Sequence, residues 1–389
     1  MASAESRQRG EGTPPGHRLG RGAFLRLASA AAPLAALAAV EASASLRTEV
    51  ARKQTDVGSS GRQPVAPIAT ELSAPRPYLS ATPLDELAGS HPLVFNNPVV
   101  TANSPDPHIL KVDGGFYMVS TSHNIPAFPI RESTDLVTWR DTGLFVFTRA
   151  NQPKWAKDHF WAPELHRVGD YYVAYYTARS RITDRLCIGA AASQAPFGPY
   201  RDLGHPLVSA TTNVLDATFF RDEDGRQYLY WKADAGPGDA SGPIHARELA
   251  PNGLSLAGPQ WDVAQTDQPW ELGLIEGPTV LKRDGAYYLF YSGAAFDSTT
   301  YAIGVARSSS PIAGFEKRGE PILQSGERWR GPGHNSIVSH EGFDYIAYHA
   351  WEGVQFRNLR QSLIQPLLWG EDGWPLVNDA GTPGGAGAT

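Results

Sequence analysis

The hydrophobic positions of this chain recur with a long period. Five times a glycine-bearing turn leads into a short run of aromatic and aliphatic residues, at positions 113–119, 169–176, 224–231, 284–291 and 341–348. The turn glycines Gly114, Gly169, Gly225, Gly285 and Gly342 are 55, 56, 60 and 57 residues apart. Short runs of this composition, bounded by turn residues, are typical of β-strands. The pattern therefore predicts five copies of one β-rich unit.

A second pattern recurs inside some units. An apolar run followed by a proline-bearing turn occurs at residues 188–200 and again at 303–315, and residues 130–139 supply further short runs in the first unit. Each unit thus offers several short strands, and no segment shows a convincing amphipathic helix. A β-helix repeats over far fewer residues, and a β-sandwich shows no such period. We predict an all-β, five-bladed β-propeller with four-stranded blades around a central channel.

Residues 92–378 form the predicted propeller, and the rest of the chain has a different composition and no such repeat. Residues 45–91 lack an apolar period, which predicts a linker or N-terminal arm, and residues 379–389 are expected to be a disordered tail. Residues 1–44 are interpreted as an export signal, because arginines precede the uncharged run 27–40 and Ala-Ser-Ala follows at 42–44. Gly22 replaces the second arginine of a twin-arginine signal, so the export route stays open. We expect a secreted, extracellular protein.

Composition narrows the class of protein further. Hydrophobic residues make up 41% of the chain and charged residues 19%, so a substantial core is expected. The net charge of −6, without a long basic run in the body of the chain, argues against nucleic acid as a partner. Cys187 is the only cysteine, which excludes an internal disulfide and a cysteine-based zinc site. The 10 Trp, 15 Tyr and 15 Phe could fill a β core or line a groove that stacks on sugar rings.

Three carboxylates share one phase of the repeat. Asp106, Asp216 and Glu276 lie 8, 9 and 9 residues ahead of the turn glycines of their units. Taken alone, each has a plain structural explanation, as a turn aspartate, a structural hydrogen bond or a solvent-facing glutamate. Their common phase places them on equivalent inner strands, facing one channel. Two carboxylates across a sugar-sized gap can protonate a leaving oxygen and activate a water, and a third can raise the pKa of the acid by charge repulsion.

At these residues the chain resembles glycoside hydrolase family 43, in its arabinanase and α-L-arabinofuranosidase branch. The similarity rests on separated motifs in the same order: Ser-Pro-Asp-Pro at 104–107, Phe-Trp-Ala-Pro-Glu at 160–164, Leu-Asp-Ala at 215–217, Ile-Glu-Gly-Pro at 275–278 and Gly-Pro-Gly-His-Asn-Ser at 331–336. Many family members have Phe or Tyr with Ala where Ser104-Pro105 stands here. This departure, and a first-unit loop at 124–130 that matches no substrate pattern, leave the specificity open.

The resemblance implies a role for each motif. Asp106 would be the general base, Glu276 the general acid, and Asp216 the residue that tunes and orients the acid, in hydrolysis with inversion. Trp161, with Phe160 beside it, would bind substrate, although a core indole is the alternative for Trp161. His334 would face the channel and is a candidate ligand for a structural calcium ion. Calcium prefers oxygen ligands, so a histidine without a metal is equally compatible with the motif.

Several functions fit this pattern. The first is cleavage of α-L-arabinofuranosidic bonds in arabinan or arabino-oligosaccharides, endo or exo, by a monomer that binds plant cell-wall carbohydrate and neither nucleic acid nor membrane. A β-xylosidase is the nearest alternative on the same acid–base pair. A retaining fructosyl hydrolase or transferase is disfavoured, because Asp106 lacks the Asn-Asp-Pro-Asn context and Glu276 is followed by Gly277 and not by Cys. A non-catalytic sugar-binding propeller is the third class.

Overall fold

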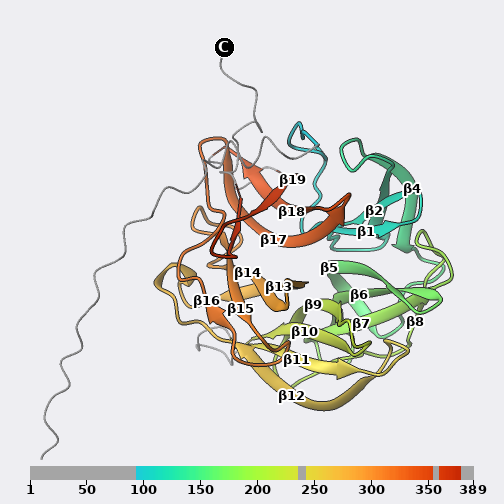
Figure 1. The fold of residues 1–389 in the computed structure, drawn as a ribbon. Helices are drawn as coiled ribbons and strands as arrows, with labels where there is room; N and C mark the ends of the chain where they lie inside the picture. The colour runs from blue at the N-terminus through green and yellow to red at the C-terminus, as the bar shows by residue number, and fades with distance from the viewer. Residues whose placement is uncertain (1–92, 235–241, 354–358, 378–389) are drawn as a thin grey trace, which may run out of the picture. The chain divides into compact units, whose positions relative to one another are not determined.

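The strands of this protein form a ring of five sheets. The computed structural model describes residues 93–234, 242–353 and 359–377, all within the unit that contains the predicted propeller. In this part of the chain there are five antiparallel sheets of four strands each, arranged around a common centre (Figure 1). The prediction of a five-bladed β-propeller with four-stranded blades is confirmed. The predicted export signal, arm and tail lie outside the described residues.

Each blade takes four consecutive strands of the chain. Blade 1 contains β1 (His108–Val112), β2 (Gly115–Val119), β3 (Ala127–Ser133) and β4 (Arg140–Phe147). Blade 2 contains β5 (Ala156–Val168), β6 (Tyr171–Ser180), β7 (Leu186–Ser193) and β8 (Arg201–Asp202). Blade 3 contains β9 (Val214–Arg221), β10 (Gln227–Ala233), β11 (Ile244–Leu249) and β12 (Leu256–Ala264). The 3-10 helix η1 (Pro269–Glu271) follows, then blade 4 with β13 (Ile275–Arg283), β14 (Ala286–Gly293), β15 (Ala302–Ser308) and β16 (Glu316–Lys317). Blade 5 contains β17 (Trp329–His340), β18 (Phe343–Glu352), β19 (Arg360–Trp369) and β20 (Pro375–Leu376).

The turn between the first and second strands of each blade explains the period of the sequence. All five turn glycines have positive φ angles, from 61° to 89°, which glycine adopts without steric cost. The aromatic runs after these turns are the second strands, and most of their residues are buried. One hairpin, repeated in the same position of each blade, therefore produces the 55- to 60-residue spacing.

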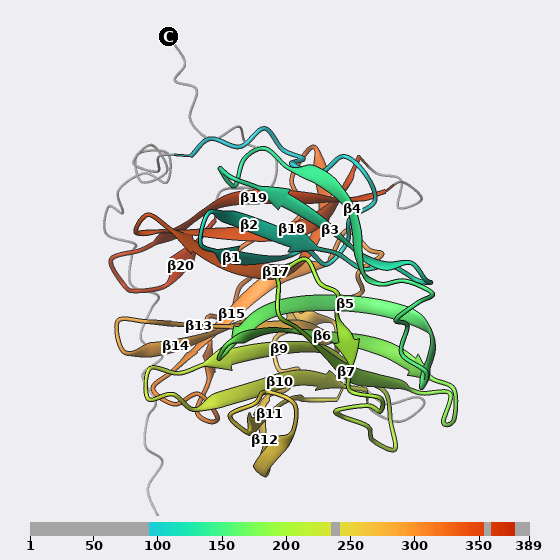
Figure 2. The same ribbon diagram turned by 90° about the vertical axis from the view of Figure 1, so that its right-hand side faces the viewer.

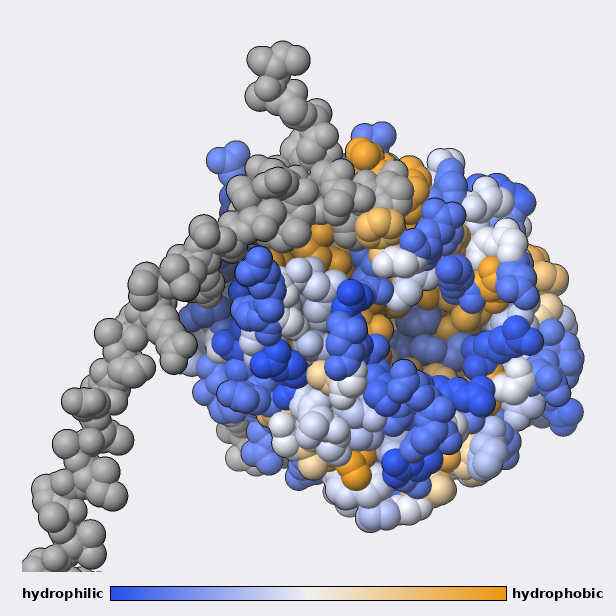
Figure 3. All heavy atoms as spheres, viewed as in Figure 1, coloured by the Kyte–Doolittle hydropathy of each residue, from blue (hydrophilic) through white to orange (hydrophobic). Residues whose placement is uncertain are grey.

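The blades pack side by side around their first strands. Strands β1, β5, β9, β13 and β17 contact one another in this order, and β17 contacts β1. Five hydrophobic clusters fill the spaces between neighbouring blades, with blade 5 packing against blade 1 (Figures 1 and 2). The face drawn in Figure 3 is hollowed, and both hydrophilic and hydrophobic residues border the hollow. No helix among the described residues is long and apolar enough to cross a membrane.

A left-handed residue recurs at or just before the first strand of every blade. These residues have φ angles between 44° and 59°, and they are Asp106, Ala162, Asp216, Gly277 and His334. In blades 2 to 5 the pairing of the first and second strands shifts register at this point. Such a β-bulge redirects the side chains around it, and bulges occur frequently beside active sites. Asp106, Asp216 and His334 are predicted site residues with this left-handed conformation, and Glu276 directly precedes Gly277, which also has it.

Candidate active site

The three predicted carboxylates line one pocket. It has a volume of about 340 Å³ and lies where the starts of the first strands meet. Residues from all five blades line it, and none of them lies on the fourth strand of a blade. They are Asn103, Asp106, Thr121, His123, Trp161, Leu215, Asp216, Glu276, Phe296, Tyr301, His334, Trp351 and Arg360. Acidic, basic and aromatic side chains thus converge on one cavity of ligand size.

Asp106 is buried and surrounded by cationic or imidazole groups. Its Oδ1 lies 3.2 Å from Nη1 of Arg360, 3.0 Å from Nδ1 of His349 and 3.7 Å from Nδ1 of His334. Burial opposes its charge, but Arg360, His334 and His349 outweigh that effect and hold the pKa of Asp106 well below its ordinary value. Asp106 is therefore an ionised carboxylate over the whole neutral and mildly acidic range, which a general base requires.

Asp216 has the opposite tendency. Its backbone N–H donates to Oγ1 of Thr177 at 3.0 Å, and its Oδ2 accepts the N–H of Gly277 at 3.1 Å. Burial, together with the charge of Glu276, raises the pKa of Asp216 to about 6, although His334 acts against this shift. Asp216 therefore keeps its own proton in mildly acidic solution, in a pocket that Glu276 also lines.

Glu276 is held at both of its carboxyl oxygens. The hydroxyl of Tyr301 donates to Oε1 at 2.8 Å, and Nζ of Lys232 lies 3.6 Å from Oε2. The Lys232 side chain is only 5% exposed and also pairs with Asp234 at 2.9 Å. Neither Tyr301 nor Lys232 was predicted as a site residue. Lys232 carries the same signal as the predicted carboxylates, a lone charge in an apolar run, whereas nothing in the sequence around Tyr301 indicates its role.

His334 connects the base to the carboxyl pair. Its Nδ1 lies 3.7 Å from Oδ1 of Asp106 and 4.0 Å from Oδ2 of Asp216. Burial lowers the pKa of His334, but Asp106, Asp216 and Glu276 raise it further, so the net shift is upward. Calcium prefers oxygen ligands, and the carboxylates near Nδ1 of His334 belong to the acid–base group. Calcium therefore stays a prediction, and no chemical step below depends on it.

A second group of possible metal ligands lies on β1 and β5. The ligand atoms of His108, Glu164 and His166 are all within 4.8 Å of one another. His166 Nε2 bonds to Oε2 of Glu164 at 2.7 Å, and the N–H of Leu165 donates to Nδ1 of His108 at 3.2 Å. Burial lowers the pKa of both histidines to about 3, so they are neutral. A neutral His108 that accepts at Nδ1 carries its proton on Nε2 and cannot offer that nitrogen to an ion. We interpret this group as a hydrogen-bonded network.

The structure separates the two predicted substrate-binding aromatics. Trp161 lines the pocket, and its Nε1 donates to Nδ1 of His123 at 3.0 Å. Phe160 is 1% exposed and packs among Phe128, Phe147 and Tyr176 in the core between blades 1 and 2. The expectation for Phe160 is wrong, because successive side chains of a strand point in opposite directions.

Other pocket residues were not predicted from the sequence. The most prominent are Phe296, Trp351 and Arg360, and the Arg360 guanidinium lies 4.9 Å from the centre of the Phe296 ring. Trp351 donates from Nε1 to the carbonyl oxygen of Phe296 at 3.3 Å. These three side chains come from the β14–β15 loop and from the second and third strands of blade 5. They lie outside the first strands, so the phase of the repeat does not point to them.

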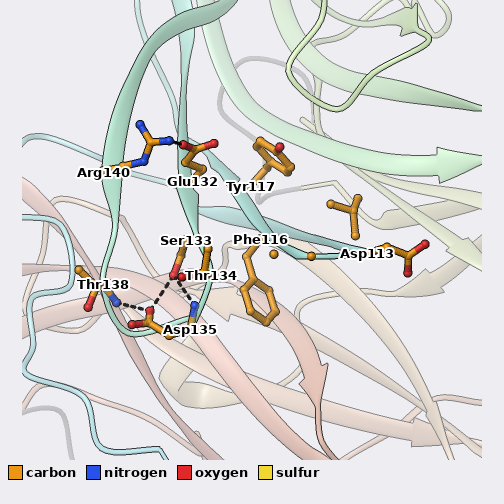
Figure 4. Close-up of a pocket in the computed structure, with 12 residues that line it drawn as sticks. Asp113, Phe116, Tyr117, Glu132, Ser133, Thr134, Asp135, Thr138 and Arg140 are labelled. Carbon is orange, nitrogen blue, oxygen red and sulfur yellow. Dashed lines mark hydrogen bonds and ion pairs between the residues drawn. The ribbon is translucent and has the colours of Figure 1, made fainter.

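A separate pocket of about 450 Å³ lies in blade 1 (Figure 4). It is formed by the β1–β2 turn and by residues of β3 and β4 and the turn between them. Apart from Asp113, its charged side chains are engaged: Glu132 pairs with Arg140, and Asp135 accepts the N–H groups of Val137 and Thr138. None of the predicted site residues lines it, and the acid–base chemistry belongs to the central pocket.

Comparison with known proteins shows the family to which this chain belongs. The model of glycosyl hydrolases family 43 matches residues 95–375. The extracellular exo-α-(1→5)-L-arabinofuranosidase of Streptomyces chartreusis is 30% identical over 70% of this chain and 87% of its own. A xylan 1,3-β-xylosidase of a Vibrio species is 25% identical over 74% of this chain and 58% of its own. The crystal structure of a thermostable family-43 glycoside hydrolase has a TM-score of 0.66 and 30% identity, over 73% of this chain and 96% of that one. The chain therefore belongs to family 43 of the glycosyl hydrolases and is a glycosidase.

Proposed function

We propose that this glycosidase is an α-L-arabinofuranosidase that releases terminal units from α-1,5-linked arabinan or arabino-oligosaccharides with inversion. The observation that carries the proposal is the asymmetry of the pocket. Asp106 is kept ionised on one side, and on the other Asp216, whose pKa is raised to about 6, lines the same cavity as Glu276. Single-displacement hydrolysis needs an ionised base and a protonated acid that face one cavity, and we assign these roles to Asp106 and Glu276.

In this mechanism each carboxyl group has one task. Asp106 removes a proton from a water molecule while the oxygen of that water forms a bond to the anomeric carbon. Glu276 transfers its proton to the glycosidic oxygen as the bond between that oxygen and the anomeric carbon breaks. Room for the water implies a separation of about 6.5–9.5 Å between the two carboxyl groups. Asp216 supplies the negative charge that favours the protonated form of its neighbour.

The pocket also supports exo action on a small sugar. Its volume of about 340 Å³ is near the lower end for ligand sites, and Trp161, Phe296 and Trp351 offer aromatic surfaces to sugar rings. The relative from Streptomyces chartreusis is named as an extracellular exo-acting arabinofuranosidase. We extend that name to this chain, including secretion directed by residues 1–44 and action as a monomer on plant cell-wall carbohydrate.

Product analysis tests the proposal directly. Debranched arabinan should yield arabinose alone, and NMR should detect the inverted anomer first. Asp106→Asn and Glu276→Gln should each lower kcat/KM by about 10²–10⁴-fold while leaving the fold intact. Long oligomers as first products would indicate endo action, and the retained anomer would contradict the acid–base assignment.

The β-xylosidase is the second candidate, because the Vibrio relative carries that name. Matched 4-nitrophenyl α-L-arabinofuranoside and β-D-xylopyranoside separate the two. A higher kcat/KM on the xyloside would replace the proposed substrate but keep the roles of Asp106 and Glu276. Binding of arabinan without turnover of any glycoside would favour the non-catalytic propeller.

A further inference from the structure

Tyr301 reaches the acid from outside the first strands. It lies between β14 and β15, and its side chain is only 1% exposed. Its hydroxyl donates to Oε1 of Glu276 at 2.8 Å, and its ring stacks on His349 with 5.9 Å between the ring centres. The hydroxyl thus arrives at the carboxyl group from a fixed direction.

The segment before His334 is shaped around this ring. A side chain on Gly333 would overlap the ring of Tyr301, and one on Gly331 would come within 2.8 Å of the carbonyl oxygen of Ser298. Gly331 also has a φ angle of 55°, which glycine tolerates best. Gly333 therefore leaves the space that the ring of Tyr301 occupies, and Gly331 allows the chain to pass close to Ser298 in the loop that carries Tyr301.

We propose that Tyr301 is a positioning residue for the general acid, which rests on the function proposed above. A hydroxyl that donates to Oε1 leaves the transferable proton on Oε2, so that the acid has one defined donor oxygen. After the transfer, the same hydroxyl stabilises the new carboxylate, as charge-assisted hydrogen bonds do. Burial raises the pKa of Tyr301 well above its ordinary value, so its hydroxyl keeps its proton and stays a donor.

The test is Tyr301→Phe, which removes only the hydroxyl. The matched control is Tyr291→Phe in the same blade, because the Tyr291 hydroxyl also donates at 2.8 Å to a buried glutamate, Glu271, away from the pocket. Both variants are assayed on a series of aryl α-L-arabinofuranosides whose leaving groups differ in basicity. The more basic the leaving group, the more its departure depends on protonation by the acid.

We expect Tyr301→Phe to lose about 10–100-fold in kcat/KM on the most basic leaving groups and little on the most acidic ones. The alkaline limb of its pH profile should move to higher pH, because the ionised acid loses a donor. Tyr291→Phe should change neither property. An equal loss across the series, or an unchanged pH profile, would show that Tyr301 only packs and would overturn the proposal.

Two further measurements keep the result decisive. If Tyr301→Phe unfolds more readily than Tyr291→Phe, 3-fluorotyrosine at position 301 keeps the ring and makes the hydroxyl a stronger donor. The alkaline limb should then move to lower pH, and an unmoved limb overturns the proposal. The wild-type product anomer tests the proposed function separately, and the same series made from xylosides serves if the wild type prefers them.

Discussion

Blade 3 differs from the other four blades in how its second strand supports the next blade. In four blades a side chain in the second half of the second strand, or just beyond it, accepts the N–H of the left-handed residue in the following blade. The donor–acceptor pairs are Ala162 to Thr121, Asp216 to Thr177, His334 to Ser292 and Asp106 to His349, at 2.6, 3.0, 2.8 and 3.1 Å. This repeated hydrogen bond satisfies a backbone N–H beside the channel and fixes each bulge.

In blade 3 the corresponding position is Lys232, whose ammonium group cannot accept a hydrogen bond. The N–H of Gly277 therefore donates to Oδ2 of Asp216 instead, at 3.1 Å. The ammonium group is left to face Oε2 of Glu276 at 3.6 Å. The structural repeat is therefore broken next to Glu276, because a cation replaces a hydrogen-bond acceptor there. Asp216 accepts the backbone hydrogen bond in its place, in addition to its proposed chemical role.

Among the changes that test this difference between blades, a substitution of Asp216 should have the largest effect on kcat/KM. Asp216→Asn keeps an oxygen that can accept the N–H of Gly277 but removes the negative charge beside Glu276. We expect kcat/KM to fall by about 10²–10³-fold, because the acid loses the neighbour that favours its protonated form. Steady-state kinetics with a poor leaving group measures this, and an activity within threefold of the wild type would contradict the assigned role.

The same variant should be more stable than the wild type at neutral pH. The pKa of Asp216 is raised from 3.8 to about 6, so the folded state retains a proton that the unfolded state releases. Stability from this group is present below pH 4 and is lost as the pH rises through 6. Asp216→Asn avoids that loss, which corresponds to about 3 kcal/mol above pH 6. Urea unfolding at pH 4 and pH 7 should show a gain only at pH 7, and an equal difference at both values would refute the linkage.

Removing one of the four repeated hydrogen bonds should mainly lower the free energy of unfolding. Thr177→Val leaves the N–H of Asp216 buried without its acceptor, and we expect a loss of about 1–3 kcal/mol in the free energy of unfolding. Thr177→Ser keeps the acceptor and serves as the control. The comparison of blades would fail if valine and serine gave the same urea midpoint.

Giving blade 3 the hydrogen-bond acceptor of the other blades should have the smallest effect on activity. Lys232→Thr supplies a hydroxyl as in the other blades but removes the cation next to Glu276. We expect kcat/KM to fall about tenfold and the alkaline limb to move up by about one pH unit, because the ionised acid loses a positive neighbour. Lys282→Thr, which removes an ion pair with Asp222 at the end of β13 opposite to Glu276, is the control. An unchanged pH profile for Lys232→Thr would mean that Lys232 acts only on Asp234.

The phase of the repeat predicted correctly which carboxylates of the first strands and their approaches line the pocket. Asp106, Asp216 and Glu276 line one pocket because their hairpins occupy equivalent positions in three blades. The same reasoning could not place Phe160, since a motif does not state which of two adjacent strand residues faces the channel. Lys232 also interrupts an apolar run, but as a cation it is not one of the acidic residues that glycosidic cleavage needs.

The sequence by itself determined the number of blades, the family motifs and the convergence of the three carboxylates. Those features are local or periodic, so the turn glycines and the alternation of strands record them. Only the tertiary structure decided which groups surround each carboxylate. Arg360, Tyr301 and Lys232 come from other strands and loops, and the distances that set ionisation and hydrogen bonding depend on how five blades pack. Electrostatic effects act between neighbours in space, and spatial neighbours distant along the chain leave no periodic trace in it.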